Sequence, residues 1–297
     1  MSTSPLEGIL AYPITPYFED TGKVDLDTLG QVIDNLIETG VCAIAALGSA
    51  GEAAYLDEDE WLQVADHTIK QVAGRVPVVI GIAELTTDKA VERAKYVDKI
   101  GADVVMISPI AYYALSEEEI YHHYETISAA VNIPIMLYNN PATSGIDMSP
   151  EFMLRMVHGI DNVKLIKESS GDIQRMHKIY ALSDGKVPFY NGCNYLAYEA
   201  INAGATGWCT AAPCLIGDKP KRLFDLIQAG DTLKAREVFY QTLDFLEFIV
   251  KKGLASSVKA GLAMQGINAG TARRPLLELP TTDKEQLKRL LDEILKS

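Results

Sequence analysis

The sequence predicts a (β/α)8 barrel, a TIM barrel, that is followed by a C-terminal extension of three helices. Short β-rich runs alternate with longer amphipathic stretches over roughly 225 of the 297 residues, an alternation typical of α/β folds with a parallel sheet. The runs are continuously apolar, as expected for parallel strands that are covered on both faces. No G-x-G-x-x-G motif follows the first run, which favours the barrel over an open doubly wound sheet.

The predicted strands are the apolar runs, and the predicted helices are the amphipathic stretches between them. The strands are expected at Ile9–Ile14, Ala43–Leu47, Val76–Ile82, Asp103–Ile107, Pro134–Tyr138, Val163–Lys167, Val187–Tyr190 and Gly207–Ala211. The helices are expected at about 26–38, 57–72, 87–100, 117–131, 149–158, 172–183, 194–203 and 216–228. Asp25, Ser116 and Ser149 precede helical stretches as capping residues. Gly40 and Gly101 follow helices as stop signals.

The tail of the chain, from about Asp231 to Ser297, has the pattern of three further helices. No Gly/Ser-rich linker precedes it, so we expect an appendage of the barrel rather than an independent domain. The predicted division is a catalytic barrel over residues 1–228 and a helical extension over residues 229–297.

The composition argues against several classes of partner and site. Lys and Arg number 27 against 40 Asp and Glu, and the net charge of −13 disfavours nucleic acid and anionic membranes as partners. The longest apolar runs, Val41–Leu47 and Val76–Ala83, are far too short to span a bilayer. The opening residues lack a signal-peptide pattern, so a cytoplasmic location is expected. The cysteines form no C-x-x-C pair, and we predict neither a metal site nor a disulfide; they are Cys42, Cys193, Cys209 and Cys214.

If the fold is a barrel, its active site lies at the C-terminal ends of the strands, where two residues stand out. Lys167 ends the sixth predicted strand, and strand alternation directs it inward while Lys164 lies lower and outward. Loss of hydration inside a barrel favours the neutral amine, which attacks a ketone or aldehyde to form a Schiff base. Tyr138 ends the fifth predicted strand, where it can relay protons during imine formation. A snorkelling lysine and an aromatic cap on the barrel are the structural alternatives.

Two loops at predicted strand ends complete the candidate site. Glycines flank a serine in the turn Gly48–Glu52, so exposed backbone N–H groups and the Ser49 hydroxyl can bind a carboxylate or phosphate. Tyr112 and Tyr113 follow the fourth strand, where they can reach a substrate or a neighbouring subunit. A plain loop and packing tyrosines are the alternatives here.

Together these motifs resemble the dihydrodipicolinate synthase/N-acetylneuraminate lyase superfamily of class I aldolases. The G-S-x-G-E turn, the Y-N-x-P strand end and the I-K-E strand recur there in the same order and at similar spacing. The segment that opens with Ala11, Tyr12 and Pro13 resembles the first strand of that family. The resemblance covers essentially the whole chain, including the three-helix tail.

The resemblance implies a role for each candidate residue. Lys167 matches the Schiff-base lysine, and Tyr138 matches the tyrosine that shuttles protons and polarises the substrate. Ser49 matches the hydroxyl that links this tyrosine to the proton relay. Tyr112 matches a relay tyrosine that crosses a dimer interface, with Tyr113 as the alternative. The other pocket residues that the family implies are Gly48, Ala50, Thr143, Gly192 and Cys209.

Two departures from the family pattern bear on the substrate. Thr143 stands where dihydrodipicolinate synthases carry an arginine that pairs with the carboxylate of the second substrate, and threonine supplies no bidentate cation. Ala50 replaces a second hydroxyl in the turn, although the N–H groups of Ser49 and Ala50 would still hold the carboxylate of pyruvate or another 2-keto acid. We therefore expect a 2-keto-3-deoxy sugar acid or a related hydroxylated 2-keto acid.

The leading hypothesis is a pyruvate-type class I aldolase or lyase that needs no metal or organic cofactor, because the imine is the electron sink. The alternatives are dihydrodipicolinate synthase, a Schiff-base dehydratase or deaminase, and a non-catalytic barrel that binds a keto acid. A metal-dependent class II aldolase is disfavoured because no His/carboxylate cluster is recognisable. The resemblance also implies a homo-oligomer, a dimer or a tetramer.

Overall fold

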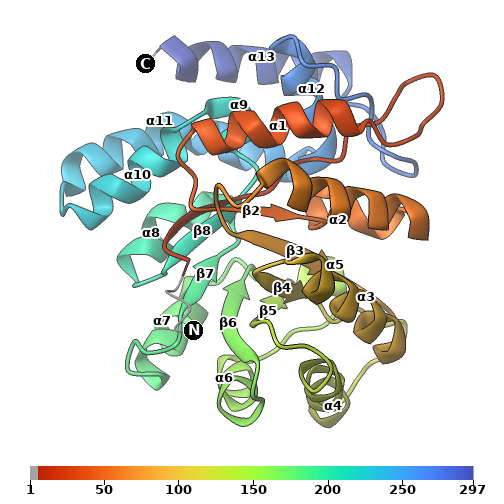
Figure 1. Cartoon of the computed structure of the whole chain (residues 1–297). Helices are drawn as coiled ribbons and strands as arrows, with labels where there is room; N and C mark the ends of the chain where they lie inside the picture. Colours follow the sequence, from red (N-terminus) through yellow and green to blue (C-terminus); the bar gives the residue numbers. More distant parts are fainter. Residues whose placement is uncertain (1–5, 297) are drawn as a thin grey trace. The chain divides into compact units, whose positions relative to one another are not determined.

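The strands form one closed barrel in the order in which they occur along the chain. The computed structural model describes residues 6–296, and the strands follow one another from β1 to β8 (Figure 1). The bounds are β1 Gly8–Ala11, β2 Ala43–Ala46, β3 Val78–Ile82, β4 Val104–Ile107, β5 Ile135–Asn139, β6 Val163–Glu168, β7 Phe189–Asn191 and β8 Gly207–Thr210. The predicted (β/α)8 barrel with a helical extension is confirmed.

Helices connect the strands close to the predicted positions. Their bounds are α1 Leu26–Glu38, α2 Glu58–Val72, α3 Thr87–Ile100, α4 Glu117–Ser128, α5 Pro141–Ser144, α6 Pro150–Gly159, α7 Ile173–Leu182, α8 Ala197–Asn202, α9 Pro213–Ile216 and α10 Lys219–Gln228. The side chains of Asp25, Ser116 and Ser149 accept backbone N–H bonds at the starts of α1, α4 and α6, as predicted. The predicted helix over 216–228 was wrong at its start, because Gly217 has a φ of +58° and separates α9 from α10.

Contacts divide the chain into two compact units. Unit 1 consists of residues up to Glu7 together with Pro77–Cys209, and it contains β3 to β7. Unit 2 joins Gly8–Val76 to Thr210–Ser297, and it contains β1, β2 and the tail. In each unit the strands are buried along almost their whole length, as the continuous apolar runs predict. The predicted boundary between residues 228 and 229 stays a prediction, and the opening five residues, expected to hold no signal peptide, lie outside the described part.

The tail forms three helices, as expected. They are α11 Thr232–Lys251, α12 Leu254–Met264 and α13 Thr281–Lys296, and α11 packs against α10 and α13. Helix α12 is the most buried of the three, and it buries a lysine, Lys259, among its small and apolar residues. None of the helices within residues 6–296 is long and apolar enough to cross a membrane.

Gly270, in the segment between α12 and α13, allows a close approach of two backbones. A Cβ at this position would lie 2.1 Å from the carbonyl oxygen of Tyr17, and the φ of Gly270 is +67°. Gly266 also has a positive φ, +89°, but within residues 6–296 no atom beyond its two chain neighbours lies within 4 Å of its Cβ position. We expect Gly270→Ala to lower the free energy of unfolding by about 2 kcal/mol more than Gly266→Ala, since only the first adds a clash to the backbone strain. Urea unfolding of the two variants checks this, and equal midpoints would contradict it.

Candidate active site

Lys167 and Tyr138 lie next to each other at the ends of neighbouring strands. The sheet register pairs Tyr138 of β5 with Lys167 of β6, so both side chains leave the sheet on the same face. Lys167 is 5% exposed, and its Nζ lies 3.9 Å from the centroid of the Tyr138 ring and 3.8 Å from Sδ of Met106. Lys164 on the same strand is exposed, as the alternation predicts. A buried primary amine therefore stands beside a phenol at the C-terminal end of a barrel strand.

This pair can perform imine chemistry. An unprotonated amine adds to a carbonyl carbon, and a phenol beside it can exchange protons with the adduct. The Tyr138 ring attracts the ammonium form of Lys167 through its π face. The Tyr138 hydroxyl accepts a hydrogen bond of 2.8 Å from Nδ2 of Asn140, which helps to orient the phenol.

The residues that follow this pair hold the two strand ends together. Asn139 comes after Tyr138 and Glu168 after Lys167; they are paired in the register, and both are completely buried. The Asn139 Nδ2 donates a 3.0 Å hydrogen bond to Oε2 of Glu168, and the Arg175 guanidinium lies 3.4 Å from the same oxygen. A buried carboxylate is tolerated only with such partners. The pair therefore fixes the backbone on which Lys167 and Tyr138 sit.

Gly192, after β7, leaves the room that the Lys167 side chain occupies. A Cβ at Gly192 would lie 2.9 Å from Cε of Lys167 and 1.8 Å from Oγ of Ser169. Ser169 did not emerge from the sequence as a site residue, and its Oγ is buried with no hydrogen-bond partner among residues 6–296. An unpaired buried hydroxyl near an amine is a candidate contact for a bound molecule. The signal that could have found Ser169 is its position two residues after Lys167, on the same face of an extended chain.

The other predicted residues of unit 1 differ in exposure. Tyr112 and Tyr113 are 86% and 77% exposed, and their rings meet edge to face with centroids 5.0 Å apart. Thr143 is exposed in α5, where its Oγ1 donates a 3.3 Å hydrogen bond to the carbonyl oxygen of Asn140. Cys209 is buried in β8. The contacts within this unit join Lys167 to Tyr138 and Gly192, whereas Tyr112 projects into solvent in the single chain.

In unit 2, the predicted anion-binding turn follows β2. Ser49 begins a 3-10 helix, η1 (Ser49–Gly51), with its side chain exposed, while Ala50 and Gly51 are buried. The first N–H groups of a helical segment have no acceptor within it, which makes those of Ser49 and Ala50 available to a ligand. The hydroxyl of Thr15 donates a 2.6 Å hydrogen bond to the carbonyl oxygen of Gly51 and fixes the end of the turn. Gly48, Ser49 and Ala50 therefore lie in one small ordered element.

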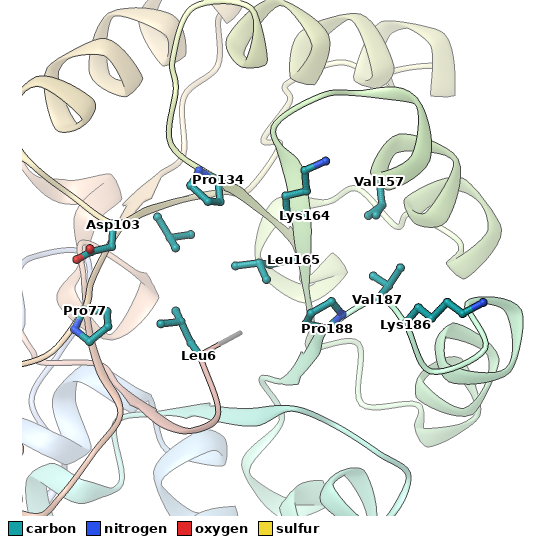
Figure 2. Close-up of a pocket in the computed structure, with 11 residues that line it drawn as sticks. Leu6, Pro77, Asp103, Pro134, Val157, Lys164, Leu165, Lys186, Val187 and Pro188 are labelled. Atoms are coloured by element: carbon teal, nitrogen blue, oxygen red, sulfur yellow. The ribbon is translucent and has the colours of Figure 1, made fainter. Parts of the chain in front are cut away.

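A cavity of about 470 Å³ in unit 1 lies at the opposite ends of the strands (Figure 2). Pro77, Pro134 and Pro188, which precede β3, β5 and β7, line it together with Leu165. The amine of Lys164 points away from it in Figure 2, and the lining contains none of the predicted site residues. Within residues 6–296, no group of three or more His, Cys, Asp or Glu side chains could hold a metal ion.

Comparisons with known proteins identify the family of the chain. A model of the dihydrodipicolinate synthetase family matches residues 5–294. The 4-hydroxy-tetrahydrodipicolinate synthase of Bacillus subtilis is 30% identical over 95% of this chain and 97% of its own. The enzyme of the same name from Trichlorobacter lovleyi is 32% identical over 97% of this chain and 98% of its own. A crystal structure from Pseudomonas aeruginosa, provisionally assigned as a dihydrodipicolinate synthetase, is 49% identical with a TM-score of 0.96 and covers 98% of this chain and 100% of its own.

These matches extend over nearly the whole chain, so they apply to the barrel and to the tail alike. Enzymes of this family are lyases and synthases of the class I aldolase type. They act through a lysine Schiff base and use no metal or organic cofactor. The chain belongs to the dihydrodipicolinate synthetase family and is a Schiff-base lyase of the class I aldolase type.

Proposed function

We propose that this enzyme acts on a 2-keto acid through a Schiff base on Lys167, and that its substrate is a 2-keto-3-deoxy sugar acid or a related hydroxylated 2-keto acid. The observation that carries the proposal is the buried Lys167 amine, 3.9 Å from the ring centroid of Tyr138 at the C-terminal end of β6. Family membership supports Schiff-base chemistry, and it favours an enzyme over a keto-acid-binding barrel without activity.

The proposed reaction has four steps. The Lys167 amine adds to the C2 carbonyl, Tyr138 donates the proton with which the carbonyl oxygen leaves as water, and a protonated imine remains. The bond between C3 and C4 then breaks; its electron pair moves into the imine to form an enamine, and the C4 hydroxyl gives up its proton to Tyr138. Protonation of C3 restores the imine, and water releases pyruvate from Lys167. In the alternative dehydration reaction, the bond between C3 and C4 stays intact, and the C3 proton and the C4 hydroxyl leave as water.

We assign the other predicted residues to binding and proton relay. The N–H groups of Ser49 and Ala50 hold the substrate carboxylate, and the Ser49 hydroxyl connects Tyr138 to the relay. Tyr112 of a second copy of the chain completes that relay in a homo-oligomer, and its exposed position in the single chain is compatible with this role. The remaining lining residues are Gly48, Thr143, Gly192 and Cys209.

The choice of substrate rests on Thr143. This side chain is neutral, and its hydroxyl already donates to the carbonyl oxygen of Asn140. A neutral polar group suits the hydroxyls of a sugar acid better than a second carboxylate, which calls for a bidentate cation.

A second candidate function is dihydrodipicolinate synthase, which condenses pyruvate with aspartate semialdehyde. The names of the curated relatives favour it. Assays with a panel of 2-keto-3-deoxy acids, N-acetylneuraminate, and pyruvate plus aspartate semialdehyde distinguish the candidates. Turnover of only the last mixture would replace the proposed substrate class with this one.

Reduction with borohydride tests the shared chemistry. We expect incubation with pyruvate and borohydride to attach one reduced pyruvate unit to Lys167, seen by mass spectrometry of the intact protein and of its peptides. The addition of EDTA should leave the yield unchanged, because the imine needs no metal. Folded protein that forms no adduct on Lys167 would refute the proposed mechanism.

A further inference from the structure

A buried ion pair joins the tail to the end of the predicted anion-binding turn in unit 2. Lys259 lies in α12, and its Nζ lies 2.6 Å from Oε1 of Glu52, the residue that follows η1. The two side chains are 2% and 1% exposed. The second carboxylate oxygen of Glu52 accepts a 2.6 Å hydrogen bond from the backbone N–H of Arg273. Both oxygens of this carboxylate are therefore held by the last quarter of the chain.

The partners of Glu52 are themselves fixed from several sides. The Lys259 Nζ donates a 3.1 Å hydrogen bond to the carbonyl oxygen of Thr271, and it lies 3.9 Å from the centroid of the Tyr17 ring. The Arg273 guanidinium lies over the same ring and binds the carboxylate of Glu60 in α2. This hydrogen bond keeps the pKa of Glu60 below its usual value. The carboxylate of Glu52 thus meets a preorganised positive environment.

The backbone of Glu52 is part of the turn itself. Its φ is +55°, the left-handed region, and its N–H donates a 3.2 Å hydrogen bond to the carbonyl oxygen of Ser49. The N–H of Ala53 in turn lies 3.5 Å from the carbonyl oxygen of Gly48. A left-handed conformation in a residue with a side chain persists only where its surroundings enforce it. The ion pair supplies such an enforcement two residues from Ala50.

The ion pair between Lys259 and Glu52 is not explained by a gain in the stability of the fold. Two charges removed from water gain little over apolar residues of the same volume, but they select one arrangement of the groups that carry them. Burial lowers the pKa of Lys259 to about 8, and the charge of Glu52 opposes this shift. The Glu52 carboxylate, 2.6 Å from Nζ, thus favours the ammonium form of Lys259 against the effect of burial.

We propose that Lys259 is a positioning residue, and that its ion pair with Glu52 holds the turn Gly48–Gly51 in the conformation that binds the substrate carboxylate. This inference rests on the proposed function, in which the N–H groups of the turn bind the substrate carboxylate. It gives the three-helix tail a functional role: α12 and the segment after it hold Glu52, and through Glu52 they fix the backbone amides of the turn. Lys259 touches no substrate atom in this arrangement.

Two measurements on Lys259→Met test the proposal. In hydrogen exchange of the substrate-free enzyme, the amides of residues 48–53 should exchange about tenfold faster than in the wild type, while the peptides of β6 stay unchanged. In borohydride trapping, the pyruvate concentration that gives half-maximal labelling of Lys167 should rise about tenfold, with the same maximal labelling. A rise in half-saturation without a fall in the maximum separates carboxylate binding from the chemistry at Lys167.

Two further variants control for the cost of an unpaired buried charge. Glu52→Gln/Lys259→Met removes both charges, and we expect it to regain most of the wild-type unfolding midpoint but to keep the raised half-saturation. Lys284→Met breaks an exposed pair with Glu278 in the same tail and should change neither measurement. Wild-type exchange and half-saturation in folded Lys259→Met and in the double variant would overturn the inference. If the wild type itself is not labelled by pyruvate, the proposed function fails, and the exchange of residues 48–53 still decides whether Lys259 positions the turn.

Discussion

Lys167→Met is expected to lower kcat by about 10⁴-fold or more while leaving the fold intact. Methionine fills nearly the same volume as the lysine stem, so the packing against Tyr138 and Met106 is retained. What disappears is the amine that we propose forms the covalent bond to the substrate, and methionine cannot form an imine. Steady-state assays on the best substrate of the panel measure the loss, and circular dichroism confirms the fold.

Lys164→Met is the matched control for this experiment. It makes the same substitution three residues earlier on β6, at a side chain that is exposed and lies on the other face of the strand. We expect wild-type kcat and wild-type labelling by pyruvate and borohydride. Equal losses of kcat in the two variants would show that the loss comes from disturbing β6 in general. A loss of kcat in Lys167→Met well below ~10⁴-fold would exclude Lys167 as the residue that forms the imine.

Gly192→Ala is expected to lower kcat/KM by about 100-fold without unfolding the protein. The added Cβ lies 2.9 Å from Cε of Lys167 and 3.0 Å from Cβ of Ser169, so the amine must move by several tenths of an ångström. The Ser169 hydroxyl, at 1.8 Å, can rotate away, but Cβ of Ser169 is attached to the backbone, and the Lys167 side chain can yield only by moving the end that carries its amine. A displaced nucleophile no longer meets the carbonyl carbon at the productive angle.

Two comparisons isolate this effect. Gly30→Ala places a methyl group 3.1 Å from the flexible end of Gln71 and should leave kcat/KM unchanged. Adding Ser169→Ala to Gly192→Ala removes the closest contact, yet the crowding of Lys167 persists, and we expect activity to stay low. Full recovery in this double variant would attribute the defect to the serine hydroxyl instead.

The sequence was informative wherever the relevant pattern is local. The alternation of β6 placed Lys167 inward and Lys164 outward, because side chains of a strand point to alternate faces. Capping residues such as Ser116 located helix starts to within a residue. The ends of elements were less predictable: the first strand stops at Ala11 instead of Ile14, and α4 stops at Ser128 instead of residue 131.

What the sequence did not reveal depends on contacts between distant segments. Asn139 and Glu168 become partners only through the register of β5 and β6. A lysine such as Lys259 is common in helices and does not stand out in the sequence, and only the fold shows that it faces Glu52. The room beside Lys167 likewise depends on Gly192 and Ser169, which meet only in the folded chain. Such pairings have no period and no fixed spacing, so a single sequence does not encode them visibly.

Unit 2 is built from two segments that are far apart in the sequence, and this affects the order in which its contacts can form during translation. Residues Gly8–Val76 are synthesised before the stretch Pro77–Cys209, and the rest of their unit, Thr210–Ser297, is synthesised after it. Arg273 lies 221 residues after Glu52, and synthesis of that stretch takes roughly 10–45 s at ordinary rates of translation. Over that interval the continuous stretch Pro77–Cys209 is completed first. A chain that stops short of α12 therefore already contains Lys167 and Tyr138 but lacks both Lys259 and Arg273, the partners of Glu52. If the tail positions the turn as we propose, the turn becomes ordered only after the tail has been synthesised.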